Sequence, residues 1–375
     1  MMAARFLRGF ALAATVGVLA ACSSSPKVAQ PLPLPPVANL MATGLAWSVQ
    51  VGAVHEGLQP QVSAGRVFAA SAAGAVVAVD AQSGAVVWRA ELNAPLAAGV
   101  GSDGETAAVV TRENQLVAVR DGREVWRVRL NARSFTSPLV AGKRVFVLTA
   151  DRSVSAYDSA NGARLWTTTR PADPLVLSQS GALLAVGDSL VAGMSGRLAG
   201  FNPDNGALRW EVPLASPRGT NEIERLVDIV GPAARLGSSV CARAYGAAVG
   251  CVDASRGAPV WTKPAQGTTG VHGDDRLLFG SETDGRFTAW RRDSGEPAWT
   301  IERLKHRHLS APLALGRVVA VGDNTGLVHL VSREDGSEMT RLSTDGSPVL
   351  AQPVLAGNAL VVLTRNGGLY AWRPQ

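Results

Sequence analysis

The sequence predicts an all-β protein whose strands form eight four-stranded blades in a ring, and three observations predict it. A Trp-containing motif recurs about every forty residues along most of the 375-residue chain. Each repeat divides into four short β-rich runs separated by turns with Gly, Asn or Asp. The two ends of the chain carry complementary parts of one repeat. Four antiparallel strands per repeat of this length are typical of a β-propeller.

The repeated motif is Ala-x-Asp-x-x-x-Gly-x-x-x-Trp, first seen over residues 78–88. Its Gly-to-Trp step of four recurs at Gly84/Trp88, Gly122/Trp126, Gly162/Trp166, Gly206/Trp210, Gly257/Trp261 and Gly295/Trp299. From Trp47 onward the successive intervals are 41, 38, 40, 44, 51, 38 and 41 residues, and the last ends at Thr340 in place of a Trp. We interpret the Trp side chains as packing between blades, the small residues as space for the indole, and the Asp or Asn as a turn former.

The chain ends fix the number of blades. After Thr340 only three strand-like runs follow, at 353–355, 360–363 and 368–372, and residues 44–49 supply the fourth. Pairing of the first run with the last three closes the ring and leaves no exposed edge. We therefore predict eight blades over residues 43–375, closed by the N-terminal strand.

The N-terminus predicts export and a lipid anchor. Residues 1–21 have the charged start, short apolar run and small-residue exit of a signal peptide, and the run is too short to span a bilayer. The sequence up to Cys22 resembles a bacterial lipobox, which implies acylation of Cys22, and Ser23 after it implies export to the outer membrane. An ordinary secretory signal is the alternative. We expect residues 22–42, rich in Ser and Pro, to be an unpacked tether reaching up to about 60 Å.

Composition excludes several functions. The formal charge of +6 falls to +4 without Arg5 and Arg8 of the signal peptide, and no dense basic run remains, so we expect no nucleic-acid partner. His306 and His308 are flanked by cations and have no evident third ligand, so we expect no metal site there. No set of residues with catalytic spacing is found.

Two cysteines remain beyond Cys22. Superposition of the motif places Cys241 where Phe68 stands and Cys251 where Ala78 stands, opposite each other on one hairpin. We predict a disulfide in an oxidising periplasm, with two buried thiols as the alternative.

Spacing also indicates a binding surface. The two long intervals, 44 and 51 residues, place extra residues after Trp166 and after Trp210, between the last strand of one blade and the first of the next. Both insertions therefore lie on the same rim of adjacent blades, and lengthened loops on one face of a repeat protein commonly bind partners. For Leu175 and Leu177, contact with a partner and burial in the fold are equally expected, whereas we expect Leu226 to be part of the core.

The repeat motif also resembles the blades of quinoprotein dehydrogenases, which bind pyrroloquinoline quinone and calcium at the ring centre. This chain is shorter and lacks the adjacent Cys-Cys pair of those enzymes. A shared fold alone does not imply the reaction. A quinoprotein-type enzyme therefore stands as one alternative, and a cell-wall or polysaccharide-binding propeller as another.

The whole chain, with lipobox, Pro-rich tether and quinoprotein-like propeller, resembles the BamB family of outer-membrane protein assembly factors; residues 175–177 and 220–228 resemble that family's partner-binding segments. The resemblance implies a non-enzymatic scaffold without cofactor, monomeric within the β-barrel assembly (BAM) complex. It implies a lipid anchor in the outer membrane, a periplasm-facing ring, and docking on the POTRA domains of BamA and other BAM subunits. The implied contacts are Leu175, Leu177, Ser178, Arg225 and Asp228. Here Ser178 stands where the family has Arg, and Val230 stands where it has a second acidic residue.

Overall fold

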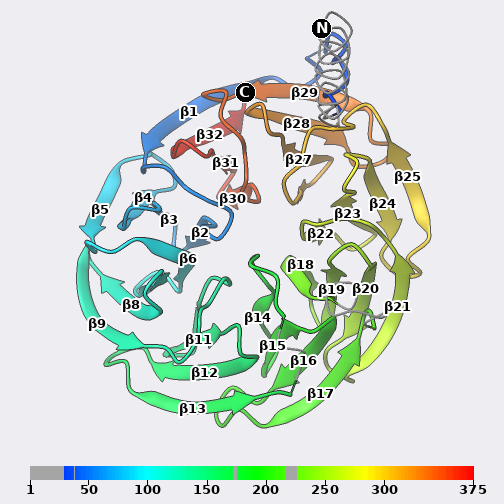
Figure 1. Cartoon of the computed structure of the whole chain (residues 1–375). Coiled ribbons are helices and arrows are strands. Elements are labelled where there is room, and N and C mark those ends of the chain that lie inside the picture. The colour runs from blue at the N-terminus through cyan, green and yellow to red at the C-terminus, as the bar shows by residue number, and fades with distance from the viewer. Residues whose placement is uncertain (1–28, 38, 172–174, 217–225) are drawn as a thin grey trace, which may run out of the picture.

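The fold is a closed ring of eight antiparallel sheets (Figure 1). The computed structural model describes residues 29–37, 39–171, 175–216 and 226–375. Those residues form 32 strands, four to a sheet, and contain no helix. A helix able to cross a bilayer is accordingly not found among them. The prediction of an all-β, eight-bladed β-propeller is confirmed.

Blades 1 to 4 each use four consecutive strands, ordered from the ring centre outward, as Figure 1 shows. Blade 1 contains β2 (Gln61–Ser63), β3 (Arg66–Ala70), β4 (Ala75–Asp80) and β5 (Val86–Glu91). Blade 2 contains β6 (Leu96–Ser102), β7 (Ala107–Thr111), β8 (Gln115–Arg120) and β9 (Arg123–Arg129). Blade 3 contains β10 (Leu139–Ala141), β11 (Arg144–Leu148), β12 (Ser153–Asp158) and β13 (Arg164–Thr169). Blade 4 contains β14 (Leu183–Val186), β15 (Ser189–Met194), β16 (Arg197–Phe201) and β17 (Leu208–Pro213).

Blades 5 to 7 repeat this order, and blade 8 completes the ring. Blade 5 contains β18 (Ile229–Leu236), β19 (Ser239–Ala244), β20 (Ala248–Asp253) and β21 (Ala258–Pro264). Blade 6 contains β22 (Val271–Gly273), β23 (Leu277–Ser281), β24 (Phe287–Arg291) and β25 (Pro297–Ile301). Blade 7 contains β26 (Leu313–Leu315), β27 (Val318–Gly322), β28 (Leu327–Ser332) and β29 (Glu338–Ser343). Blade 8 joins β30 (Val354–Ala356), β31 (Ala359–Leu363) and β32 (Gly368–Pro374) to the N-terminal β1 (Thr43–Gln50).

Closure of the ring depends on the pairing of β1 with β32. The two strands run antiparallel, and Trp47 lies opposite Ala371 in the register. This pairing gives blade 8 its outer strand, so no blade is left with an open edge toward the chain ends. The predicted closure by the N-terminal strand is confirmed.

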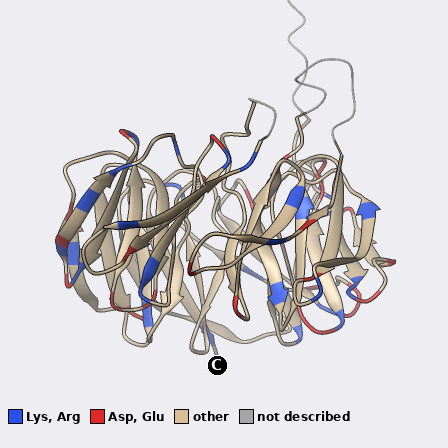
Figure 2. Cartoon of the chain, turned by 90° about the horizontal axis from the view of Figure 1, so that it is seen from below, with Lys and Arg blue, Asp and Glu red and all other residues tan. Residues whose placement is uncertain are grey.

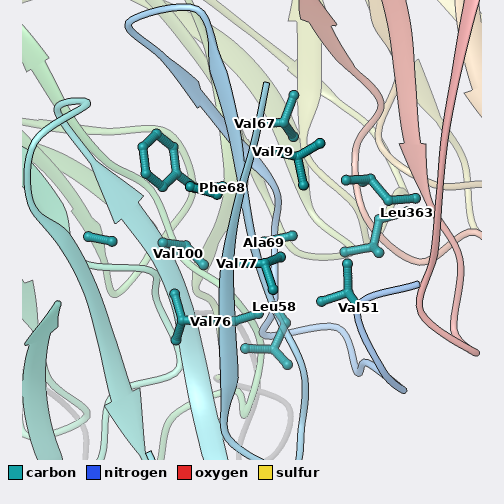
Figure 3. Packing of buried hydrophobic residues seen from close by; sticks show 14 of the residues in the cluster. Val51, Leu58, Val67, Phe68, Ala69, Val76, Val77, Val79, Val100 and Leu363 are labelled. Carbon is teal, nitrogen blue, oxygen red and sulfur yellow. The ribbon is translucent and has the colours of Figure 1, made fainter. Parts of the chain in front are cut away.

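The core consists of apolar layers between neighbouring blades. Val67 and Val79 of blade 1 point toward Leu363 of blade 8, while Phe68 points the other way, toward Val100 of blade 2 (Figure 3). All five side chains are buried. Each such side chain stabilises the fold by roughly 1.5–3 kcal/mol relative to its exposed state. Middle strands are apolar on both faces because each sheet is covered by a blade on either side.

The motif Trp side chains connect successive blades. Five indole N–H groups donate to backbone carbonyls of the next blade, at distances of 2.8–3.2 Å: Trp47 to Ala81, Trp126 to Ser159, Trp166 to Pro203, Trp261 to Arg292 and Trp299 to Arg333. The motif carboxylate forms the turn, because Asp80 Oδ1 accepts from the amides of Gln82 and Ser83 at 3.1 and 2.8 Å. Both observations confirm the packing and turn roles inferred from the repeat.

Part of the expected tether is in contact with the ring at the one blade without a motif Trp. Thr340 stands at that position, and its hydroxyl donates to Asn39 Oδ1 at 3.0 Å. Beside it the amide of Leu40 donates to the carbonyl of Met339 at 2.9 Å. Leu34 packs against the apolar cluster of blades 6 and 7. These contacts differ from the sequence expectation that the whole segment remains unpacked.

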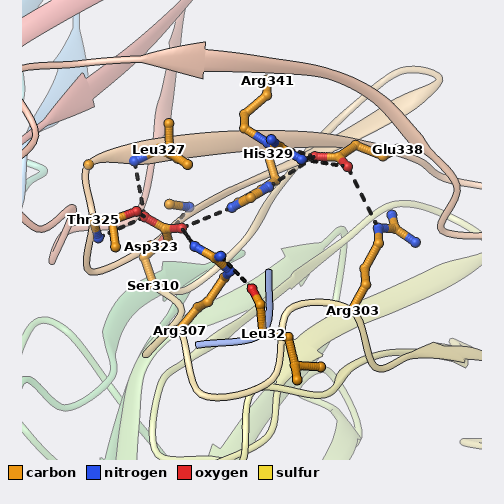
Figure 4. A network of polar contacts seen from close by, with 12 residues as sticks. Leu32, Arg303, Arg307, Ser310, Asp323, Thr325, Leu327, His329, Glu338 and Arg341 are labelled. Atoms are coloured by element: carbon orange, nitrogen blue, oxygen red, sulfur yellow. Dashed lines mark hydrogen bonds and ion pairs between the residues drawn. The ribbon is translucent and has the colours of Figure 1, made fainter. Parts of the chain in front are cut away.

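A buried ionic network anchors the same segment (Figure 4). The guanidinium of Arg307 donates to the Leu32 carbonyl at 2.7 Å and to Asp323 at 3.1 Å. His329 lies between Asp323 and Glu338, with its ring nitrogens 3.1 and 3.2 Å from their carboxylate oxygens. Burial opposes ionisation of Asp323, but hydrogen bonds, that of His329 foremost, lower its pKa to about 2. Proline-rich segments have few amides, so their carbonyls are free to accept from such arginines.

Candidate partner-docking rim

One rim of the ring carries the turns between second and third strands and the connections between blades, and the opposite rim carries the remaining turns. Figure 2 shows the ring edge-on, with basic and acidic segments interspersed on both rims. The lengthened connections, from β13 to β14 and from β17 to β18, both belong to the first rim. We call the part of it formed by residues 175–178, Arg152, Ser195 and Asp228 the docking rim.

The first lengthened connection presents an apolar edge. Leu175 is 38% exposed, Leu177 is half-buried and Ser178 is exposed. The sequence left partner contact and burial open for both Leu residues. In the structure Leu175 faces solvent, whereas Leu177 is partly packed. Arg225, the remaining contact implied by the family resemblance, lies outside the described residues. Leu226, expected to be core, is only half-buried.

Asp228 fixes the geometry of this edge. Its Oδ1 accepts from Arg152 Nη1 at 2.7 Å and from the amide of Ser195 at 2.9 Å, and its Oδ2 accepts from the amide of Leu177 at 3.3 Å. Arg152 also donates to the Leu175 carbonyl at 3.1 Å. The ion pair of Asp228 and Arg152 thus connects turns of blades 3 and 4 with the backbone of both Leu residues of the rim.

The burial of Asp228 changes the role that the sequence suggested for it. Its side chain and that of Arg152 are each about one-tenth exposed. Removal of one member of a buried pair typically costs about 3–5 kcal/mol, since the other charge is left unpaired. Asp228 is therefore placed to position the apolar edge from beneath, whereas a direct contact would require an exposed carboxylate. Arg152 and Asp228 are 76 residues apart in the sequence. The repeat pattern therefore did not indicate that they form an ion pair.

The ring centre contains a separate cavity of about 230 Å³. Its lining includes two carboxylates, Glu56 and Glu282, and no Phe, Tyr or Trp. Glu282 already accepts from the buried Arg243 at 3.2 Å. A planar quinone stacks best on an aromatic ring, and calcium takes six to eight oxygen ligands, so this lining does not fit the quinoprotein cofactor. No group of three or more His, Cys, Asp or Glu side chains suited to a metal is found in the described ranges.

The candidate disulfide and the histidine examined as a metal ligand do not take part in the contacts of the docking rim. Cys241 and Cys251 face each other across β19 and β20, with Cα atoms 3.9 Å apart and a disulfide between them. Their register matches that of Phe68 and Ala78 in blade 1, as superposition of the motif predicted. His308 lines the central cavity. Cys22, the candidate lipidation site, lies outside the described residues.

The fold and its repeat define an eight-bladed propeller of the quinoprotein-like class. The chain matches the family described as "Outer membrane protein assembly factor BamB" over residues 42–97 and 72–301. It is 37% identical to the outer membrane protein assembly factor BamB of Burkholderia pseudomallei, over 99% of each chain. The chain belongs to the BamB family of outer-membrane protein assembly factors.

Solved structures agree with this membership. The crystal structure of BamB from Moraxella catarrhalis superposes with a TM-score of 0.80 at 25% identity, covering 88% of this chain and all of that one. A quinohemoprotein alcohol dehydrogenase from Pseudomonas putida superposes with a TM-score of 0.65 at 14% identity, covering 89% and 76%. The second likeness shows a shared fold only.

Proposed function

We propose that this protein is a non-enzymatic lipoprotein scaffold of the BAM complex that docks on the POTRA domains of BamA and assists the folding and insertion of outer-membrane β-barrels. Acylated Cys22 anchors it in the outer membrane, and the ring faces the periplasm. The membership in the BamB family supports this assignment. No cofactor is part of the proposed function.

The observation that carries the docking proposal is the fixed apolar edge of the docking rim. Leu175 is exposed in a connection whose carbonyl and amide groups are held by Arg152 and Asp228. An edge that is already ordered loses little conformational entropy when it binds, and apolar side chains at the centre of such a contact contribute much of the affinity. The ring beneath supplies a rigid support.

Affinity capture tests this function. The tagged mature protein is extracted from outer membranes in mild detergent, and co-purified BamA is quantified by mass spectrometry. We expect BamA with the wild-type protein and much less with Leu175→Ala combined with Leu177→Ala. The matched control is Leu236→Ala combined with Leu355→Ala, because both residues are nearly half exposed on the opposite rim. Absence of BamA from the wild-type sample contradicts the proposal.

Asp228 gives a second comparison. The sequence alone predicts a milder loss for Asp228→Ala than for the Leu pair. The structure predicts a loss at least as large, since alanine leaves Arg152 unpaired and releases the Leu177 amide. Asp228→Asn keeps an acceptor oxygen and should retain more BamA than Asp228→Ala. Equal recovery with all variants removes the docking rim from the interface.

A further inference from the structure

A cavity of about 770 Å³ opens on the same rim, between blades 1, 2, 3 and 8. Three arginines line it, each from a different turn or connection: Arg112 between β7 and β8, Arg133 between β9 and β10, and Arg365 between β31 and β32. All three are exposed. The single carboxylate in the lining is Glu56, so the cavity has an excess of positive charge.

These arginines differ from most others in the protein in having no side-chain partner among the described residues. Arg152 and Arg307, for example, are each bound to a carboxylate at 2.7–3.1 Å. No such hydrogen bond or ion pair is formed by Arg112, Arg133 or Arg365 within the described ranges. A guanidinium presents five donors in a planar fork that fits a carboxylate, so three unused forks around one cavity form an anion-binding arrangement.

The backbone holds the three arginines in place. The amide of Arg112 donates to the Pro95 carbonyl at 2.8 Å, and the carbonyls of Arg133 and Arg365 accept from the amides of Ala150 and Val54 at 2.7 and 2.8 Å. The backbone from which the three side chains project is therefore held in place before any ligand arrives. Such preorganisation lowers the entropic cost of binding.

His55 belongs to the wall of the cavity and is held there by two hydrogen bonds to the backbone. Its Nδ1 accepts from the amide of Gly57 at 3.1 Å, so its other nitrogen carries the proton and donates to the Leu96 carbonyl at 3.0 Å. These two bonds fix the segment that carries Val54 and Glu56 into the lining.

We propose that this cavity binds an acidic polypeptide segment of a protein partner. Its lining combines the arginines with apolar groups, among them Phe135 and Leu350, which suits side chains with aliphatic stems better than a small free anion. Ser178 of the docking rim is also part of the lining, so the cavity is continuous with the surface proposed to bind BamA. The choice of a polypeptide as the ligand rests on that proposed function. The cavity and its arginines are features of the structure and do not depend on it.

Fluorescence anisotropy tests the proposal with the full mature protein in detergent. The probe is a fluorescein-labelled decapeptide of alternating Ser and Glu, and a Ser and Lys peptide of equal length is its control. We expect saturable binding of the Glu peptide that weakens as salt is raised, because exposed charges are screened. Arg112→Gln, Arg133→Gln and Arg365→Gln combined should weaken binding at least about tenfold. Arg317→Gln, an exposed arginine on the opposite rim, should leave binding unchanged.

Three outcomes overturn the proposal: no binding of the Glu peptide to the wild-type protein, equal binding by the triple variant, or displacement of the peptide by millimolar inorganic phosphate at matched ionic strength, which indicates a small-anion site. Unchanged circular dichroism and thermal unfolding of the triple variant establish that it is folded. Because the assay contains no BamA, its failure is distinct from failure of the capture experiment above.

Discussion

The indole of Trp47 lies directly against Gly84 of the next blade, so that a Cβ atom at residue 84 would stand 2.5 Å from Cγ of the indole. The same relationship holds for five more motif glycines, each against the motif Trp of the preceding blade: Gly162, Gly206, Gly257, Gly295 and Gly336. At Gly122 the contact is looser, because the nearest atom is the Cβ of Trp88 at 3.2 Å. The glycine also has a φ of +75°, in the left-handed region that disfavours other residues. One residue therefore provides both a turn and a packing surface for the neighbouring blade.

Gly84→Ala should destabilise the ring through both effects. Left-handed backbone costs about 1–2 kcal/mol for alanine, and forcing a methyl group against the indole adds roughly 1–3 kcal/mol. The matched control is Gly65→Ala, since Gly65 has a φ of +71° and no atom within 4 Å of the added Cβ. The free energy of unfolding, measured by denaturant titration, should fall clearly further for Gly84→Ala. Equal losses for the two variants contradict the packing role.

Thr340→Val should loosen the N-terminal segment without harming the ring. Valine has the shape of threonine but cannot donate to Asn39 Oδ1, a hydrogen bond that contributes about 1 kcal/mol. Hydrogen–deuterium exchange of a peptide covering residues 30–42 should then become roughly fivefold faster, while the peptide covering β31 remains protected. Unchanged exchange in the first peptide indicates that this contact does not hold the segment.

Stability should fall as the pH is lowered from 6.5 to 4, through His272. Burial, with repulsion from Arg292, lowers the pKa of His272 to about 4, and its Nδ1 accepts from the Ala314 amide at 3.1 Å. The unfolded chain therefore binds a proton that the folded chain does not, between these pH values. This contribution to the free energy of unfolding, roughly 3 kcal/mol, is present in full well above pH 6.5 and is lost as the pH falls to about 4.

His272→Gln is the variant that checks this pH dependence. Glutamine keeps an acceptor for the Ala314 amide and does not titrate. Denaturant unfolding of the variant at pH 7, 5.5 and 4.5 should show a flatter profile than that of the wild-type protein. Parallel profiles show that other groups cause the loss. Below pH 4 both proteins should weaken further, since the lowered pKa of Asp323 contributes stability that is lost as its carboxylate is protonated.

The disulfide between Cys241 and Cys251 should resist denaturation in the absence of reductant. Thiol titration of the unfolded, unreduced protein should detect neither cysteine. Substitution of both by alanine should lower the free energy of unfolding by about 2–3 kcal/mol, as a loop of this length predicts. Two reactive thiols in the unreduced protein would show that the cysteines are unpaired.

The repeat predicted the parts of the fold that recur. Regular Trp spacing gave the eight blades, and the incomplete repeats at the chain ends gave the pairing of β1 with β32. The register of Cys241 with Cys251 followed from superposition of one blade on another. These features were predictable because each depends on contacts within a blade or between neighbours.

Features that occur once were not predictable in this way. The bond between Arg307 and the Leu32 carbonyl joins residues 275 positions apart, and Asp228 and Arg152 are 76 apart. The sequence placed Leu175 and Asp228 in lengthened connections on one rim but could not show that the carboxylate is buried beneath the edge. The three arginines of the basic cavity come from separate turns and connections, and no local pattern distinguishes them from other surface arginines.

Binding of purified periplasmic BamA domains to the mature protein tests the central claim most directly. Calorimetric titration should give a defined affinity for the wild-type protein. Leu175→Ala combined with Leu177→Ala should weaken it about tenfold to a hundredfold, and Leu236→Ala combined with Leu355→Ala should leave it unchanged. An affinity that is the same for all three proteins would contradict docking through this rim.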